Sequence, residues 1–252
     1  MFRFFRNWRD RRILRRFPVT EAQWQAAFAQ LPLLDGLSAD ELRRLRELVP
    51  LFLHRKSLEA AQGLVLDDHK ALVIALQACL PILNLGLDWY DGWVSIVVYP
   101  EAFRPVRTMV DEYGVEHRSQ DALSGEAWGR GVVILSWADT EHAGVIDGHN
   151  LVIHEFAHKL DMLNGAANGF PPLHAGMDAR HWSETFSHAY ANFQHHQHQG
   201  IDPYAATDPA EFFAVLSELF FERPEVLHHH YPEVYALMQQ FYRQDTLARF
   251  RD

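Results

Sequence analysis

The sequence predicts a mainly helical α+β fold with a small β-sheet, and three observations support this prediction. Helical spacing of apolar residues covers most of the chain from residue 20 to residue 80. Two short runs, 93–99 (WVSIVVY) and 131–137 (GVVILSW), are rich in β-branched and aromatic residues, which favour buried strands. Helical patterning returns from about residue 150 and continues toward the C-terminus. Helices and strands that are segregated in this way are typical of an α+β domain.

Three helices are expected in the N-terminal third of the chain, over 20–31, 38–53 and 68–80. The second of them has a clear start signal. Ser38 is a favourable N-cap residue, and Glu41 follows three positions later, so the two side chains can form a capping box.

The two predicted strands are separated by a polar stretch, 100–130, which is expected to be loop with a short ordered piece. The C-terminal helical region is interrupted at 164–176 (NGAANGFPPLHAG) and at 199–208 (QGIDPYAATD), where turn-forming residues concentrate. Internal repeats and Gly/Ser linkers are absent from the sequence. Residues 18–252 are therefore expected to form a single two-lobed domain.

The composition of the 252-residue chain is that of an ordinary globular protein, with 48% hydrophobic and 22% charged residues. The single cysteine, Cys79, allows no internal disulfide and fits a reducing compartment, so a cytoplasmic location is expected. The formal net charge of -10 argues against direct nucleic-acid binding by the body of the protein. The most apolar span, 71–89, is interrupted by polar residues and a proline, so stable membrane insertion is not expected.

The first 17 residues differ from the rest of the chain, because they contain seven Arg and one Asp. An apolar core and a small-residue cleavage site, which a signal peptide needs, do not follow this segment. Residues 1–17 are therefore expected to be a basic, mobile N-terminal arm.

The motif that indicates chemistry is HExxH at 154–158 (HEFAH). His154 and His158 are four residues apart, which places both imidazoles on one face of a helix, where they can share one Zn²⁺. Glu155 lies beside them, so its carboxylate can take a proton from a metal-bound water. The pattern predicts a hydrolytic zinc centre with one ion per chain.

The helix that carries this motif is supported by its own sequence. Asn150 can cap its start, and Asn164 with Gly165 can end it. Asp161 can be either an exposed acidic residue or the acceptor for an imidazole N–H. A buried stripe is expected from the residues with helical spacing, Ile153, Phe156, Ala157, Leu160 and Leu163. The nearby strand at 131–137 would suit a cleft edge that pairs with an extended peptide.

Catalytic zinc usually has three protein ligands, so a third one is required. The extended motif HExxHxxGxxH, in which a third histidine follows six residues after His158, is excluded. Its Gly and third His positions hold Asp161 and Asn164 here. A downstream glutamate is the alternative, and the candidates are Glu184, Glu211, Glu218 and Glu222. In DPAE, Glu211 can be a ligand or the capping-box partner of Asp208, and Glu218 can ligate or support a ligand. The residues alone leave this choice open.

Two long motifs, HEFAHKLDMLNG and DPYAATDPAEFFAVLSELFF, resemble the Mlc titration factor A family of bacterial zinc peptidases. The similarity covers most of residues 20–250 and includes LPILNLGLDWYDGW and VYPEAF. A more distant similarity to the protease domain of anthrax lethal factor implies a gluzincin-type, zincin-like fold. The resemblance implies the following roles: zinc ligands His154, His158 and Glu211, base Glu155, and Tyr204 as the donor to the oxyanion.

The resemblance also implies a fourth ligand, His117 in YGVEHRSQD, which would make the resting enzyme latent. The expected function is hydrolysis of peptides or unfolded protein segments, with amino- and endopeptidase action both open. Because the family is named for sequestering the glucose repressor Mlc, the resemblance further implies regulation of sugar uptake through that repressor. A non-catalytic protein that only sequesters a transcriptional repressor is the alternative.

Overall fold

The computed structural model describes residues 10, 12–14, 18–101, 107–110, 116–119, 131–142, 144–196 and 198–250, and for 107–110 and 116–119 it describes the backbone only. The predicted mobile arm, 1–17, falls largely outside these residues. Within the arm, Ile13 is buried in the hydrophobic core, and Asp10 lies 3.6 Å from Arg55. The domain boundary at residue 18 stays a prediction.

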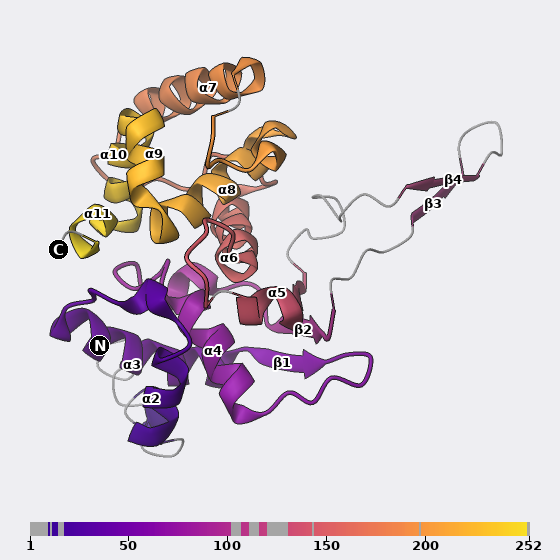
Figure 1. Cartoon of the computed structure of the whole chain (residues 1–252), viewed down its shortest axis with the longest axis vertical. Helices are drawn as coiled ribbons and strands as arrows, with labels where there is room; N and C mark the ends of the chain where they lie inside the picture. Colours follow the sequence, from indigo (N-terminus) through magenta and orange to yellow (C-terminus); the bar gives the residue numbers. More distant parts are fainter. Residues whose placement is uncertain are drawn as a thin grey trace.

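The chain is mainly helical with a small parallel sheet, so the predicted fold class is confirmed (Figure 1). The α-helices are α2 (Glu21–Phe28), α3 (Ala39–Arg55), α4 (Asp68–Cys79), α5 (Trp137–His142), α6 (Leu151–Asp161), α7 (Ala179–His195), α8 (Pro209–Glu222), α9 (Pro224–His230), α10 (Pro232–Tyr242) and α11 (Thr246–Arg249). The 3-10 helices are η1 (Pro32–Leu34), η2 (Leu87–Tyr90), η3 (Met162–Asn164) and η4 (Pro203–Ala206). The strands are β1 (Ser57–Ala60), β2 (Ser95–Tyr99), β3 (Arg107–Val110), β4 (Glu116–Ser119) and β5 (Val133–Ser136).

The three predicted N-terminal helices are confirmed as α2, α3 and α4, with ends that differ by a few residues. The capping box at the start of α3 is also confirmed. The Ser38 hydroxyl accepts from the Glu41 N–H at 3.3 Å, and the Glu41 carboxylate accepts from the Ser38 N–H at 2.9 Å. These two bonds satisfy backbone donors that a helix start otherwise leaves unpaired.

The sheet has three parallel strands in the order β1-β2-β5, and β5 forms an edge of it. The central strand β2 buries Ile96 and Val98 completely, whereas β1 is largely exposed. The strand predicted at 131–137 is confirmed but shorter, because Trp137 already begins α5. The short ordered piece expected within 100–130 is an antiparallel pair of strands, β3 and β4.

Helices α6 and α8 pack against each other and determine where the site lies. In Figure 1, α6 lies between the N-terminal group of α2, α3 and α4 and the C-terminal group of α7 to α11. Every residue of α8 from Ala210 to Glu222 is buried, as expected for a helix that is enclosed on all sides. α6 is anchored by Phe156, whose ring lies 5.0 Å from Tyr90 and 5.6 Å from Trp93.

The predicted buried stripe of α6 is confirmed for four of its residues, which are completely buried: Ile153, Phe156, Ala157 and Leu160. Leu163 was predicted in the same stripe, but it is 38% exposed. The reason is that α6 ends at Asp161, so Leu163 belongs to η3 and no longer follows the helical spacing. Among the described helices, none has the length and apolar character needed to cross a membrane.

Candidate metal centre

Asn150 makes three hydrogen bonds at the start of α6, and two of them hold this start against α8. Its side-chain oxygen accepts from the Ile153 N–H at 2.9 Å, which makes it the predicted N-cap. Its own N–H donates to Glu218, and its Nδ2 donates to Glu222 Oε1 at 2.9 Å. Because both glutamates belong to α8, the first turn of α6 is held in one position relative to α8.

Three predicted residues converge where α6 and α8 face each other: His154, His158 and Glu211. Glu211 Oε2 lies 2.9 Å from His154 Nε2 and 3.4 Å from His158 Nε2. The two Nε2 atoms are 3.2 Å apart. Each of the three side chains is at most 13% exposed. Within the described residues, this group could hold a metal ion.

The geometry of the three donor atoms fits a small divalent ion. For zinc at about 2.0–2.1 Å from each donor in a tetrahedral site, neighbouring donors would be about 3.3 Å apart. The three measured separations, 2.9, 3.2 and 3.4 Å, are close to this value. Within the described part of the chain, Glu211 Oε2 is moreover buried without an oriented hydrogen bond, although two imidazole nitrogens lie beside it. A buried carboxylate oxygen that lacks such a bond is expected where an ion completes the site.

The electrostatics of the group also favour a cation. Burial alone would lower the pKa of His154, but the carboxylates of Glu211 and Glu218 hold it well above its usual value. Burial alone would raise the pKa of Glu211, but the imidazoles of His154 and His158 hold it well below its usual range. The site therefore stabilises positive charge between its carboxylates.

The structure distinguishes among the four glutamates that the sequence left open. Glu211 does not form a capping box, because Asp208 alone caps α8 by accepting from the N–H groups of Ala210 and Glu211. Glu218 lies on the far side of the His154 ring, with Oε1 2.8 Å from Nδ1. Glu222 bonds to Asn150, and the exposed Glu184 pairs with Arg180 at 2.7 Å. Only Glu211 of these four faces both Nε2 atoms.

Glu155 and Tyr204 both lie near the group formed by His154, His158 and Glu211. Glu155 is partly buried, and burial raises its pKa while the two histidines partly offset the rise. Tyr204 belongs to η4, its ring lies 6.2 Å from that of His154, and it lies close enough to Glu211 to be affected by its charge. Burial and the negative charge of Glu211 raise the pKa of Tyr204 well above its usual value, so its hydroxyl keeps its proton.

Two other predicted residues have different outcomes. Asp161 is completely buried rather than exposed, and its Oδ2 accepts from the N–H groups of Asn168 and Gly169 at 2.7 Å each. The acceptor for His154 is therefore Glu218. The side chain of His117, in β4, lies outside the described residues, so its role as a fourth ligand stays a prediction.

The sequence reasoning missed that Glu222 supports this site, although a signal was present. Glu211, Glu218 and Glu222 are seven and four residues apart in a largely apolar helix, so they lie on one face. Three carboxylates on one face of a buried helix need polar partners, and α6 provides them.

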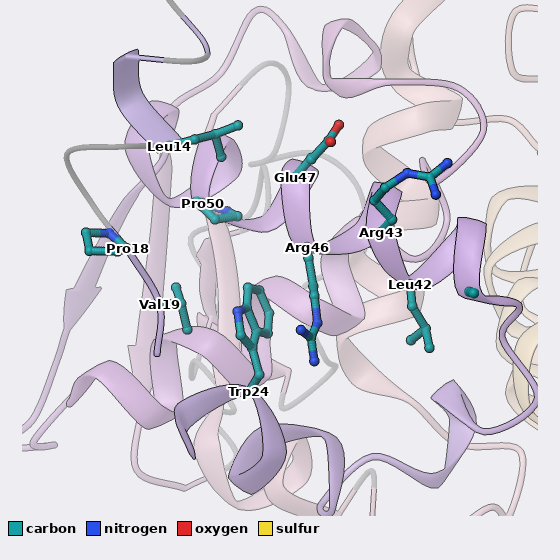
Figure 2. A pocket seen from close by; sticks show the side chains of 10 residues that line it. Leu14, Pro18, Val19, Trp24, Leu42, Arg43, Arg46, Glu47 and Pro50 are labelled. Atoms are coloured by element: carbon teal, nitrogen blue, oxygen red, sulfur yellow. The ribbon is translucent and has the colours of Figure 1, made fainter. Parts of the chain in front are cut away.

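A pocket of about 610 Å³ lies elsewhere, between α2 and α3 (Figure 2). Figure 2 shows Arg46 extending toward Trp24 inside it. The guanidinium of Arg46 already forms two bonds to Glu21, at 2.8 and 2.9 Å, and that of Arg43 bonds to Asp40 at 2.7 Å. Because the basic groups lining the pocket are paired with carboxylates, its geometry gives no reason to assign it a ligand.

Comparison with known proteins gives consistent matches over most of the chain. Residues 5–243 match the family described as "Glucose-regulated metallo-peptidase M90". "Mlc titration factor A" of Salmonella typhi is 44% identical over 237 residues, which are 90% of this chain and 88% of that protein. The protein of the same name from Cronobacter sakazakii is 42% identical over 90% of this chain and 88% of its own length. That from Yersinia pestis is 40% identical over 91% and 87%.

Proposed function

Because this chain belongs to the glucose-regulated metallo-peptidase M90 family, we propose that it is a zinc-dependent peptidase. The zinc ligands in this proposal are His154, His158 and Glu211. The observation that carries it is the convergence of two imidazole nitrogens and one buried carboxylate oxygen within 3.4 Å of one another. Two histidines and a glutamate are a donor set of catalytic zinc, which keeps its fourth position open.

Zinc held by these residues would polarise a peptide carbonyl and make water a better nucleophile near neutral pH. Glu155 then takes the proton of the attacking water and delivers it to the leaving amine. Its raised pKa suits this role, because a general base works best when its pKa approaches the working pH.

Tyr204 donates a hydrogen bond to the oxyanion that forms when the carbonyl is attacked. This proposal is supported by the position of its ring beside His154 and by a hydroxyl that stays protonated. A donor that is already in place stabilises the developing charge without reorganisation.

The substrate in this proposal is an extended peptide or an unfolded protein segment. Strand β5 lies at an edge of the sheet and contacts α6, which carries Glu155. An edge strand offers backbone donors and acceptors to an added chain, so it can align a peptide beside the site. We place this reaction in the cytoplasm, as expected from the single cysteine.

The experiment that tests the proposal combines metal content with hydrolysis of a small peptide panel. The variants are Glu155→Gln, His154→Ala and Glu211→Ala. We expect one zinc per chain in the wild type and in Glu155→Gln, and loss of zinc in the other two. Hydrolysis should be lost in all three, because Gln cannot take the proton and the others lack the ion.

Glu141→Gln is the control for the first variant, because Glu141 is exposed on α5. It should cleave at the wild-type rate. Wild-type cleavage by Glu155→Gln would contradict the role of Glu155, and full zinc in Glu211→Ala would contradict its role as a ligand.

We propose as a second function that the chain binds the Mlc repressor and thereby regulates sugar uptake. The support is the name "Mlc titration factor A" of relatives that are 40–44% identical over about nine-tenths of the chain. The two functions separate in Glu155→Gln, which should bind purified Mlc like the wild type although it no longer cleaves peptides. Absence of measurable Mlc binding by the wild type would contradict this second function.

A further inference from the structure

Two buried polar atoms on α6 each lack a hydrogen-bond partner among the residues that the structure describes, and they are complementary. One is Nδ1 of His158, the ring nitrogen that faces away from Glu211. The other is Oδ1 of Asp161, three residues later in the same helix. Residues three apart in a helix are neighbours on its surface, and the charges of these two residues interact. Buried donors and acceptors in folded proteins are nearly always paired.

Asp161 is held rigidly from its other oxygen. Oδ2 accepts two backbone N–H groups, from Asn168 and Gly169, each at 2.7 Å. These bonds fix the carboxylate, which is completely buried, so its Oδ1 has a defined position, outside direct hydrogen-bond contact with His158. A ligating histidine usually donates its second ring N–H to a carboxylate, a backbone carbonyl or a water, and this bond orients the ring.

We infer that Asp161 is a positioning residue whose Oδ1 accepts the Nδ1 proton of His158. The two atoms are not in hydrogen-bond contact in the structure. The bond therefore requires a small shift of the His158 ring or one bridging water, and in both cases the proton stays on Nδ1. His158 then presents the lone pair of Nε2 to the centre that it shares with His154 and Glu211. The two histidines are thus oriented by different elements: Glu218 of α8 holds His154, and Asp161 of α6 holds His158.

The functional consequence of this inference rests on the proposed zinc site. Its test does not, because it can be made on the metal-free protein. The first measurement is ¹⁵N NMR of His158 in the metal-free wild-type protein above neutral pH. We expect a protonated Nδ1. A deprotonated Nδ1 would overturn the inference, whether or not the protein binds zinc and whether or not any variant folds.

The second measurement uses Asp161→Asn. Asparagine keeps an oxygen for the N–H groups of Asn168 and Gly169, but it directs an amide N–H₂ toward His158. Nδ1 must then accept, so the ring proton moves to Nε2, which loses the lone pair that a metal needs. We expect the ¹⁵N signals of His158 to show this tautomer, and zinc affinity in a chelator competition to fall about 10–100-fold.

Two further variants make the result specific. Asp178→Asn is the matched control, because Asp178 also accepts two backbone N–H groups, from Arg180 and His181, but is exposed at the start of α7. It should change neither zinc affinity nor His158. Glu218→Gln should change the ¹⁵N signals of His154 and leave those of His158 in place.

The outcomes separate the two proposals. If the wild type binds no zinc while Asp161→Asn shifts the His158 proton, the proposed zinc function fails and the positioning role stands. If zinc binds and Asp161→Asn changes neither the affinity nor the tautomer, the positioning role fails and the zinc site stands.

Discussion

Glu218 Oε1 lies 2.8 Å from Nδ1 of His154, on the opposite side of the imidazole from Glu211. The ring is therefore held between two carboxylates of one helix. Because Glu218 also accepts from the N–H of Asn150, the bond that orients His154 is tied to the bond that fixes the start of α6. The packing of α6 on α8 and the direction of the His154 ring are thus set by the same few atoms.

Glu218→Ala should weaken zinc binding about 10–100-fold, because His154 loses the acceptor that fixes its orientation. Titration of the apo protein with zinc in the presence of a competing chelator measures this. Glu184→Ala is the control, because Glu184 is exposed and pairs with Arg180 on the surface of α7. Equal zinc affinity in the two variants would show that Glu218 does not support the site.

Tyr204→Phe should lower kcat about 10²–10³-fold with little change in KM or zinc content, because it removes one oxyanion donor and leaves the ligands in place. Steady-state kinetics on a peptide that the wild type cleaves measures kcat and KM separately and so checks this prediction. Tyr231→Phe serves as the control, since Tyr231 is also a largely buried tyrosine, but its hydroxyl donates to Asn192. A rise in KM with unchanged kcat would assign Tyr204 to substrate binding instead.

Glu222 makes the stability of the protein depend on pH. Burial, together with the negative charges of Glu218 and Asp147, raises its pKa from 4.5 to about 8, although bonds from Asn150 and Gly148 partly offset the rise. Between these two values the folded chain holds a proton that the unfolded chain releases. The free energy of unfolding should therefore fall as the pH rises from 4.5 to 8, by about 1–4 kcal/mol.

Glu222→Gln should flatten this pH dependence, because the side chain no longer titrates. At low pH the variant should be about 1 kcal/mol less stable than the wild type, since its N–H₂ cannot accept from both Asn150 and Gly148. Denaturant unfolding across this pH range gives both quantities. Glu225→Gln, an exposed glutamate nearby, should keep the wild-type slope, and the same slope in Glu222→Gln would refute the assignment.

The local parts of this fold could be predicted from the sequence, because their causes are local. The capping box of Ser38 and Glu41 and the N-cap of Asn150 are determined within three residues, and both formed as expected. Strand β1 could not be found in this way. Its sequence, SLEA, has no strand pattern, and it is a strand because it pairs with β2 across 38 residues.

The proposed third ligand, Glu211, shows the same limit within the site. Next to Asp208 and Pro209, Glu211 has the sequence of a capping-box partner, and nothing local distinguishes that role from ligation. The docking of α6 on α8 favours ligation, because it places two imidazoles beside the carboxylate. The burial of Asp161 could not be predicted from its own helix for the same reason, because the loop that bonds to it contains residues 168 and 169.

Gly169 lies where the loop after α6 touches the start of α8. Its φ is +75°, and a Cβ at this position would stand 2.5 Å from the carbonyl oxygen of Pro209, the first residue of α8. Gly169→Ala should therefore lower the free energy of unfolding by about 2–4 kcal/mol, from backbone strain and from displacement of Pro209. Glu211 follows Pro209 by two residues, so zinc affinity should fall as well.

Gly176→Ala separates the effect of backbone strain from the effect of displacing Pro209. Gly176 also has a positive φ, +97°, but a Cβ there would meet nothing within 4 Å, so only the backbone strain of about 1 kcal/mol applies. Thermal unfolding and zinc titration of both variants should show a larger loss of stability in Gly169→Ala, and a loss of zinc affinity in that variant alone. If the two variants behaved alike, contact between this loop and α8 would not position Glu211.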